Sequence, residues 1–455
     1  MHRIPTVALA LTTVSWLGAC AIDPGPTTIR VDGDVREWPA GHRAVADDEF
    51  VYVRFAVPEA RTLQASGVPT RILIDADASG ETGHAEHGVG AELEIALSPE
   101  GRGFGSAVRA FDETGEASDI GHAAIDFHFA PTYAATQFEA RFSRRAWAMG
   151  GLADAGGQMR GVVVSGEDAS PFTLAVHPAG EPTVDETRVP PTAAGCVRVV
   201  SWNVLRGAPD EQPKAFGRVI KALAPDIVLV QEWDERTSDE LAAWFGEHAG
   251  GAWSAATLPR SGVGVVTKHA LIDGPAGPVE MGEGWPARCV GAVVRTPMGE
   301  ILCSSVHLKC CGSAGSDEDI RREAEARAIG RTLPGMFPAA TPDTVIIGGD
   351  LNLVGSRPAI DILAETLDVD GSSLAIAEPR VLSDGSAYTW SEDDSSFTPG
   401  RLDWVLVGDQ NASIERAFVL DARRLSDAAL AEAGVERGDT SVSDHLPVVV
   451  DVRIR

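Results

Sequence analysis

Five apolar runs in the C-terminal half of the chain constrain its fold more than any other feature. The runs span residues 197–204, 226–231, 344–348, 402–407 and 446–452. They are rich in aliphatic and β-branched residues throughout rather than at alternate positions, as expected of strands that are covered on both faces. Helical patterns lie between them, including one with apolar residues at i, i+3, i+4 and i+7 from Phe216 that ends before Pro225. The sequence therefore predicts a layered α/β domain.

Two more helices have recognisable starts in this half of the chain. Thr237 and Glu240 fit a capping box, in which each side chain bonds the backbone of the other residue. Ser316 and Asp319 begin a second helix, whose apolar residues include Ile320. Both helices are expected to belong to the layered domain.

The N-terminal third of the chain has a different pattern. From residue 28 to 182, short alternating runs such as 50–55 and 71–74 are separated by Gly, Pro and Asp, which predicts an all-β domain. We interpret residues 183–195, part of a stretch rich in Pro, Thr and Gly, as the linker to a second domain at 196–455. A length of 455 residues agrees with two domains.

The first 20 residues have the pattern of an export signal. Residues 4–17 are mostly apolar but too few to span a bilayer. Leu17-Gly18-Ala19-Cys20 follows and resembles the bacterial lipoprotein cleavage box, in which the cysteine carries the lipid. We therefore expect a lipoprotein-type signal peptide at 1–20, lipidation at Cys20, and a protein anchored to the bacterial cell envelope, in the periplasm or at the cell surface. A plain secretory signal with a chance cysteine is the alternative.

Charge and cysteine content limit the partners and the redox chemistry. The chain has a net charge of −28 and lacks the excess of basic residues that a tight nucleic-acid binder carries. This weakens a nucleic-acid-processing function without excluding it, because a divalent cation offsets local charge. Beyond Cys20 an odd number of cysteines is left, so at least one thiol stays unpaired within the chain. They are Cys196, Cys289, Cys303, Cys310 and Cys311. Their pairing is not set by the sequence. Cys310 and Cys311 could form a vicinal disulfide or stay as two free thiols, and we favour a turn held by a disulfide over a redox lock.

Six polar motifs lie at or beside the apolar runs. They are Ser201-Trp202-Asn203, Gln231-Glu232, Val306-His307-Leu308, Gly349-Asp350-Leu351-Asn352, Arg401-Leu402-Asp403 and Ser443-Asp444-His445. Each supplies a carboxylate, carboxamide or imidazole, the groups that a hard cation and a phosphate require. Asp350 and Asn352 are expected to alternate onto the same side of an extended strand. The motifs together predict one metal-assisted site that hydrolyses phosphoesters.

The order and spacing of these motifs over 196–455 resemble the endonuclease/exonuclease/phosphatase superfamily. The resemblance implies a four-layer α/β/β/α sandwich with mixed sheets and a site at one end of it. It also implies Mg²⁺ or Mn²⁺ as the cofactor, held by Asn203, Glu232 and Asp444.

The same resemblance implies roles for the other polar residues. Asp350 orients or deprotonates the attacking water, and Asn352 binds a phosphate oxygen. Asp403 fixes the tautomer of His445, which acts as a general base or as a phosphate-stabilising acid. His307 protonates the leaving group.

These features predict an extracytoplasmic metal-dependent phosphoesterase, foremost a nuclease-like phosphodiesterase. A sphingomyelinase-like phospholipid phosphodiesterase and an inositol or sugar phosphatase are alternatives within the same chemistry, so that the substrate partner is a nucleic acid or a phospholipid. We recognise no exposed aromatic hairpin of the kind that lipid-cleaving relatives carry, which speaks against a lipid substrate. A glycan-binding surface protein with an inactive hydrolase domain is the alternative of another class.

Three segments of the all-β region, 31–39, 47–53 and 72–77, resemble family 9 carbohydrate-binding modules. The resemblance implies a β-sandwich that binds a glycan, with Trp38 either in the core or serving as a sugar platform. The same region fits the spacing of a calcium loop, with ligands at positions 1, 3, 5 and 12 and glycine at 6. The expected Ca²⁺ ligands are Asp75, Asp77, Ser79 and Glu86. An acidic turn is the alternative.

Overall fold

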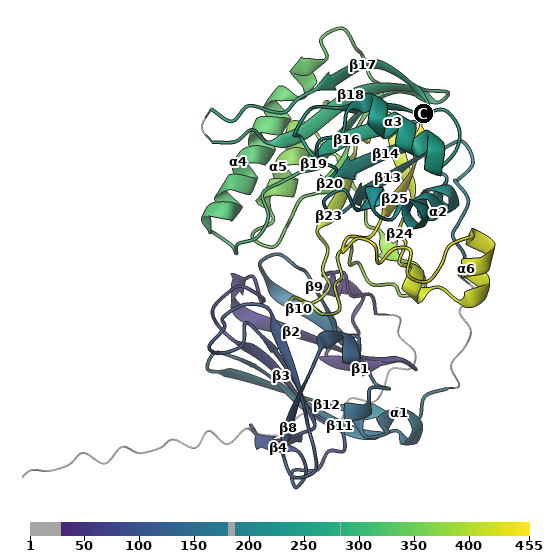
Figure 1. Ribbon diagram of the computed structural model, residues 1–455. Coiled ribbons are helices and arrows are strands. Elements are labelled where there is room, and N and C mark those ends of the chain that lie inside the picture. The colour runs from purple at the N-terminus through teal and green to yellow at the C-terminus, as the bar shows by residue number, and fades with distance from the viewer. Residues whose placement is uncertain (1–28, 181–186, 283) are drawn as a thin grey trace, which may run out of the picture.

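The computed structural model describes residues 29–180, 187–282 and 284–455. The predicted signal peptide with Cys20, and part of the predicted linker, lie outside the described residues. Figure 1 shows two stacked bodies, one of sheets from the N-terminal third and one in which helices flank sheets. Within the described ranges, no helix is both long and apolar enough to cross a membrane.

Two antiparallel sheets form the N-terminal body. The first contains, in spatial order, β1 (Ala44–Ala46), β2 (Phe50–Arg61), β10 (Ala135–Ser143) and β9 (His128–Ala130). The second contains β12 (Asp168–Val176), β11 (Gly157–Ser165), β3 (Thr70–Asp75), β6 (Leu93–Leu97), β7 (Ser106–Phe111) and β8 (Ala117–Ile120). Smaller elements are η1 (Val35–Glu37), the ribbon of β4 (His84–Glu86) and β5 (Val89–Ala91), η2 (His122–Ile125), η3 (Trp147–Met149) and α1 (Leu152–Ala155). Val51, Ile72 and Phe138 belong to one buried core that both sheets share, which confirms the predicted β-sandwich.

Two mixed sheets form the centre of the C-terminal body. One contains β15 (Ser254–Thr257), β16 (Val263–Thr267), β14 (Ile227–Gln231), β13 (Val197–Asn203), β25 (Val448–Ile454), β24 (Ala412–Val419) and β22 (Arg380–Val381). The other contains β17 (Ala270–Ala276), β18 (Arg288–Thr296), β19 (Gly299–His307), β20 (Thr344–Asp350), β23 (Asp403–Val407) and β21 (Ala375–Ile376). Val199, Leu229 and Ile346 are fully buried between the two sheets. This double cover explains why the strands read as continuous apolar runs.

Helices cover the outer face of each sheet, as Figure 1 shows. On the β13 sheet lie α2 (Pro213–Leu223), α3 (Ser238–His248) and α6 (Asp427–Ala433), and on the β20 sheet lie α4 (Asp317–Thr332) and α5 (Pro358–Thr366). Short turns at η4 (Ala208–Asp210), η5 (Pro334–Met336) and η6 (Ala422–Arg424) join these elements. The capping box of Thr237 and Glu240 is present, and Ser316 accepts a hydrogen bond from the backbone of Asp319. The predicted α/β/β/α sandwich is confirmed.

Buried ion pairs join the two bodies. Arg141 on β10 and Asp384 are 1% and 2% exposed, and their Nη2 and Oδ2 atoms lie 2.6 Å apart. Arg424 of the C-terminal body donates two hydrogen bonds of 2.6 Å to Asp126. Although burial disfavours its charged form, the guanidinium groups of Arg141 and Arg424 hold the pKa of Asp384 well below its usual range. The interface is therefore an ordered, charge-paired contact rather than a loose apposition.

The N-terminal body also holds one segment of the C-terminal body, residues 389–401. The backbone N–H of Arg401 donates to Thr132 Oγ1 at 2.9 Å, and that of Thr398 donates to Gln64 Oε1 at 2.8 Å. These contacts fix the backbone of a stretch that would otherwise be a surface loop. The start of the same segment reaches two of the predicted site carboxylates.

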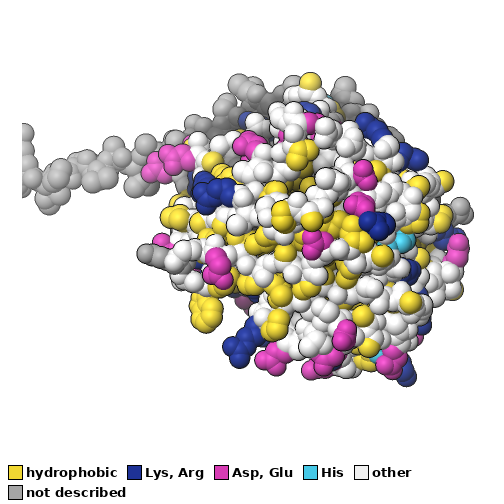
Figure 2. Space-filling model, turned by 90° about the horizontal axis from the view of Figure 1, so that it is seen from above, with side chains coloured by type: hydrophobic (Ala, Val, Ile, Leu, Met, Phe, Trp, Pro, Cys, Tyr) yellow, Lys and Arg dark blue, Asp and Glu magenta, His cyan; other side chains and the backbone are white. Residues whose placement is uncertain are grey.

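The face of the C-terminal body that is turned away from the N-terminal sheets is shown in Figure 2. Acidic and basic side chains are interspersed there among hydrophobic and other residues. Neither sign of charge dominates this face, a pattern that is common on soluble surfaces.

Candidate active site

Neighbouring strands carry the predicted site residues to one edge of the two sheets. In parallel pairs, Asn203 lies opposite Gln231 and His307 lies opposite Asp350, and in the next, antiparallel pair Asp350 lies opposite Asp403. Gly349 allows β19 and β20 to come close, because a Cβ at this position would lie 1.8 Å from the carbonyl oxygen of Val306. The sheet register therefore assembles residues that are far apart in the sequence.

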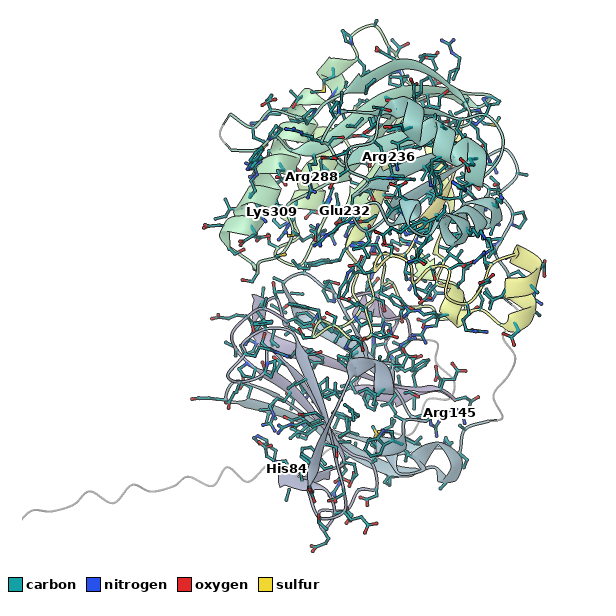
Figure 3. The ribbon with its side chains drawn as sticks, in the orientation of Figure 1. His84, Arg145, Glu232, Arg236, Arg288 and Lys309 are labelled. Atoms are coloured by element: carbon teal, nitrogen blue, oxygen red, sulfur yellow. The ribbon has the colours of Figure 1, made fainter. Side chains whose placement is uncertain are left out.

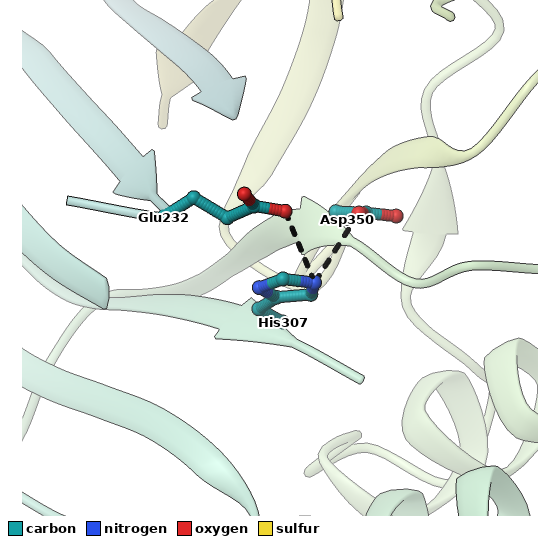
Figure 4. Close-up of side chains that lie close together, drawn as sticks. All are labelled: Glu232, His307 and Asp350. Carbon is teal, nitrogen blue, oxygen red and sulfur yellow. Dashed lines mark ion pairs between the residues drawn. The ribbon is translucent and has the colours of Figure 1, made fainter. Parts of the chain in front are cut away.

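Glu232, His307 and Asp350 form the centre of the site, as Figure 4 shows. His307 Nε2 lies 3.8 Å from Glu232 Oε1 and 3.5 Å from Asp350 Oδ2. Asn203 Nδ2 connects the two carboxylates, with hydrogen bonds of 3.1 Å to Glu232 Oε1 and 3.2 Å to Asp350 Oδ2. Asp350 is 2% exposed and Asn203 is fully buried. A buried carboxylate, Asp350, and a partly exposed one, Glu232, thus lie on either side of a buried carboxamide.

Two of these positions have left-handed backbone conformations. Glu232, directly after β14, has a φ of 61°, and Asn352 has a φ of 50°. Such conformations are uncommon for residues other than glycine and concentrate at functional sites. The expected strand alternation of Asp350 and Asn352 is wrong, because β20 ends at Asp350 and the chain turns back. Asn352 Nδ2 nevertheless reaches Asp350 Oδ2, at 2.9 Å, through this turn.

His445 is held by Asp403 next to this centre. Its Nδ1 lies 2.8 Å from Asp403 Oδ2 and its Nε2 lies 3.6 Å from Asp350 Oδ2. Asp403 Oδ2 also accepts a hydrogen bond of 2.7 Å from Thr389 Oγ1, at the start of the 389–401 segment. Because Asp403 accepts a hydrogen bond from Nδ1 of the His445 ring, the other ring nitrogen, Nε2, is directed to the centre. This arrangement matches the partnership expected for Asp403 and His445.

Asp444 lies at the side of this arrangement. Its Oδ2 accepts a hydrogen bond of 2.9 Å from Trp390 Nε1, while its Oδ1 is buried without a partner among the described atoms. Asp444 belongs to neither of the described clusters that contain Asp350. The ligand role predicted for it therefore stays a prediction.

The two histidines are driven to opposite protonation states. Burial and the charge of Arg288 lower the pKa of His307 well below its ordinary value, so His307 is neutral near pH 7. Although burial disfavours the imidazolium, the carboxylates of Asp403 and Asp350 raise the pKa of His445 to about 10. Burial raises the pKa of Asp350 to about 7. In the metal-free protein the available proton is on His445, and the acid role predicted for His307 stays a prediction.

The charge state of His445 leads to a first expectation. In the metal-free protein, the imidazole of His445 should stay protonated until about pH 10. In Asp403→Asn, its pKa should fall because the carboxylate that stabilises the imidazolium is lost. Titration of the imidazole resonances by NMR in EDTA measures both values. An unchanged pKa in Asp403→Asn would contradict the pairing, and His269→Gln, which removes an imidazole paired with Asp226 away from the site, serves as the control.

The donor set fits a hard divalent cation. Glu232 and Asp350 supply carboxylate oxygens, and one atom each of Glu232, His307 and Asp350 lie within 4.8 Å of one another. Asn203 turns its Nδ2 to the two carboxylates, and its Oδ1 accepts a hydrogen bond of 3.1 Å from the backbone N–H of Leu205. Burial makes the charged form of Asp350 costly, as its raised pKa indicates, and a cation would relieve that cost. His307 Nδ1 is also buried without a partner among the described residues. Oxygen-rich sites with few protein ligands suit Mg²⁺ or Mn²⁺.

The calcium loop expected in the N-terminal body is not assembled. Both oxygens of Glu86 bind the guanidinium of Arg71, because Glu86 lies on β4 where that side chain reaches it. Glu92 instead approaches Asp75 and Asp77. Ser79 Oγ accepts a hydrogen bond from the backbone of Glu81. The structure therefore brings together only Asp75 and Asp77 of the four expected ligands.

Three other expectations are settled by burial and by the thiol geometry. Trp38 is 5% exposed and its Nε1 donates to Glu139, so it is a core residue and not a sugar platform. The disulfide favoured for Cys310 and Cys311 is absent: both are free thiols, with their sulfurs 2.8 Å apart. The other three cysteines, which are Cys196, Cys289 and Cys303, are also free.

Sequence reasoning missed one exposed aromatic residue near the site. Trp285 is 87% exposed in the connection between β17 and β18, where no aromatic hairpin was expected. The run Gly284-Trp285-Pro286, shortly before Arg288, could have predicted this exposure. A tryptophan between two turn-forming residues lacks apolar sequence neighbours that would place it in a core.

The fold and this cluster define a class of protein: α/β/β/α sandwiches with an acidic, metal-compatible site at the end of paired sheets. A sequence profile described as the endonuclease/exonuclease/phosphatase family matches residues 200–445, a range that contains all six motifs. The chain belongs to this family. No curated protein matches its sequence.

Solved structures with a similar fold include three that differ in name. They are humanized TDP2 of D. rerio (14% identity, TM-score 0.39, 57% of this chain and 99% of that chain), sphingomyelinase C of Streptomyces griseocarneus (16%, 0.38, 56% and 99%) and the 3′ phosphatase NExo of Neisseria (17%, 0.38, 56% and 98%).

Proposed function

We propose that this chain is a divalent-metal-dependent phosphodiesterase of the nuclease-like kind. The observation that carries the proposal is the convergence of Glu232, His307, Asp350 and His445 in one buried group at the sheet edge. Family membership supports phosphoester chemistry. The choice of a diester over a monoester rests on the sequence pattern set out above.

The residues divide the chemistry between them. Glu232 and Asp350, which Asn203 Nδ2 bonds to each other, would hold Mg²⁺ or Mn²⁺, which when bound neutralises phosphate charge and polarises its oxygens. His445, protonated and fixed by Asp403, stabilises negative charge on the phosphate oxygens. Asn352 donates from its Nδ2 to Asp350 Oδ2 and to the carbonyl oxygen of Leu308, so it holds Asp350 in place, and its contact with a phosphate oxygen stays a prediction. Asp350 orients the attacking water and accepts its proton.

The cellular setting belongs to the same proposal. The pattern of residues 4–20 supports export and lipid anchoring at Cys20, so the enzyme acts outside the cytoplasm at the bacterial envelope. Mass spectrometry of Cys20-containing peptides from the native membrane fraction tests the anchor, and an unmodified peptide would contradict it. A glycan is proposed as a partner of the N-terminal sandwich only on the resemblance of its segments to carbohydrate-binding modules.

Metal dependence is the second expected result. We expect EDTA to abolish hydrolysis of bis-p-nitrophenyl phosphate and Mg²⁺ or Mn²⁺ to restore it. Glu232→Gln should weaken metal binding, because a carboxylate ligand becomes a neutral amide. Restoring its activity should therefore require at least tenfold more Mg²⁺. The concentration of Mg²⁺ that gives half-maximal rate measures the change. Glu235→Gln, which alters an exposed carboxylate three residues away, is the control and should need no additional metal. Full activity in EDTA would contradict the proposal.

A further inference from the structure

A hollow of about 520 Å³ adjoins the candidate active site, and its walls are positively charged. We call it the basic pocket and define it by the side chains that matter here: Arg260, Trp285, Arg288, Lys309, Arg321 and Glu325. Among the residues that the structure describes, four cations and one carboxylate line this hollow, in a chain whose net charge is −28. Such a local excess of cations attracts an anion.

The carboxylate in the pocket is already engaged. Glu325 Oε1 accepts a hydrogen bond of 2.9 Å from Arg321 Nε, and its Oε2 accepts one of 2.8 Å from the backbone N–H of Lys309. Arg321 also bonds the carbonyl oxygen of Trp285, which ties α4 to the loop that carries the tryptophan. Glu325 and Arg321 therefore build the wall and balance each other.

The other three cations are not balanced. Among the described residues, no carboxylate lies within ion-pair distance of Arg260, Arg288 or Lys309, whereas buried arginines such as Arg141 hold a carboxylate directly. The described contact of the Lys309 ammonium is the sulfur of Cys310, at 4.0 Å. Unpaired cations on a concave surface suit phosphate oxygens, which arginine can bind in a bidentate manner.

Residues of the pocket lie beside residues of the candidate active site. Arg288 on β18 lies directly opposite His307 on β19, and Lys309 follows His307 by two residues. Figure 3 shows Arg288 and Lys309 beside Glu232 in the C-terminal body, far from the labelled Arg145 and His84 of the N-terminal body. A phosphate in the pocket would therefore be a neighbour of the one that is cleaved.

Trp285 gives the pocket a second kind of surface. The side chain is 87% exposed, and the other apolar side chains that line the pocket in the described structure are prolines. A membrane-inserting loop presents several adjacent large apolar side chains, while a single aromatic ring among cations is typical of a surface on which nucleic-acid bases stack. Stacking on this ring requires a base that is not paired.

We infer that the basic pocket binds a single-stranded nucleic-acid segment next to the scissile phosphate, with Arg288 and Lys309 on backbone phosphates and Trp285 stacked on an unpaired base. The position of the scissile phosphate rests on the proposed function. Charge complementarity and the exposed ring distinguish this ligand from a lipid surface. The pocket then explains how a strongly acidic protein can hold an anionic polymer at its active site.

The test measures binding without turnover. The full chain carrying Asp350→Asn is titrated into a fluorescein-labelled oligothymidylate of about ten nucleotides, and Kd is measured by anisotropy over a range of salt concentrations. We expect Trp285→Ala to raise Kd by about 5- to 100-fold. Removal of two phosphate contacts in Arg288→Gln/Lys309→Gln should lower the slope of log Kd against log salt by about 1.4. If the double variant does not fold, Lys309→Gln alone is measured in its place, because Lys309 is exposed.

Matched controls and a second ligand decide the interpretation. Trp147→Ala removes another exposed tryptophan, 64% exposed on the N-terminal body, and Arg331→Gln removes an exposed cation of α4 outside the pocket; both should bind like the parent. Unchanged oligonucleotide binding in Trp285→Ala would overturn the inference. The inference would also be overturned if Trp285→Ala lost binding to sphingomyelin–phosphatidylcholine vesicles while its oligonucleotide binding stayed intact. That result would assign the pocket to a lipid surface.

Failure here differs from failure of the proposed function. If the wild-type chain hydrolyses no phosphoester but binds the oligonucleotide through Trp285 and the two cations, the pocket is supported and the proposed activity is overturned. If the wild-type chain cleaves oligonucleotides while Trp285→Ala binds them normally, the pocket inference alone is overturned.

Discussion

Replacement of Asp350 by asparagine should lower kcat/KM by about 10²- to 10⁴-fold, the usual contribution of a group that accepts or delivers a proton in the transition state. Asparagine has nearly the same shape and can keep hydrogen bonds to Asn203 and Asn352, but it neither accepts a proton nor supplies a negative charge to a cation. The initial rate of bis-p-nitrophenyl phosphate hydrolysis with Mg²⁺ measures the effect. A variant that keeps the wild-type rate would remove Asp350 from the mechanism.

The same variant should be more stable than the wild type when metal is absent. Burial raises the pKa of Asp350 from 3.8, the value of an exposed aspartate, to about 7. The folded state therefore loses stability as the pH rises from the lower of these values to the higher. At pH 8, metal-free Asp350→Asn should melt at a higher temperature than the wild type, and the difference should shrink toward pH 4. Asp427→Asn, which alters a side chain that is 96% exposed, is the control for both measurements. Lost activity together with raised stability separates a functional carboxylate from a structural one.

The largest expected loss of stability is at the interface between the two bodies. Asp384→Ala removes the 2.6 Å partner of Arg141, which is 1% exposed and keeps only Asp126 Oδ1 at 3.7 Å. Removing one partner of a buried ion pair costs about 3–5 kcal/mol. The free energy of unfolding from urea titration at pH 7 measures this loss. The double variant Arg141→Met/Asp384→Leu should recover part of it, because no charge is then buried alone.

A surface pair of the same chemistry provides the comparison. Arg357 and Asp361 form an ion pair at 3.0 Å in which both side chains are 44% exposed, so Asp361→Ala should cost about 0–1 kcal/mol. Equal losses in Asp384→Ala and Asp361→Ala would mean that the interface pair is solvated in solution.

Local patterns predicted the elements of the C-terminal body well because burial and capping act over short distances. Apolar runs became β13, β14, β20, β23 and β25, and the capping box at Thr237 begins α3. Ile320 shows the limit of such patterns, since it is 60% exposed although it was expected on the apolar side of α4. Which helix positions are covered depends on the neighbouring elements, and periodicity alone does not identify these.

The candidate site was predictable for a similar reason, since its residues follow strands whose ends meet at one edge. The geometry within it was not. The turn that returns Asn352 to Asp350 requires a left-handed φ, which a motif of four residues does not encode. The calcium loop failed because a spacing rule ignores competition, and Arg71 on a neighbouring strand takes both oxygens of Glu86. The basic pocket joins residues from four separate segments, and only the fold brings these together.

The 389–401 segment has a consequence for how this protein can be divided. Thr389 and Trp390 bond the carboxylates of Asp403 and Asp444, while the other end of the segment is bonded to Thr132 and Gln64 of the N-terminal sandwich. A gene fragment that encodes only 196–455 would keep every motif of the family and yet lose the contacts with Thr132 and Gln64 that hold the far end of this segment. We therefore expect the pair of bodies to be the unit that recombination or a cloning experiment can move intact.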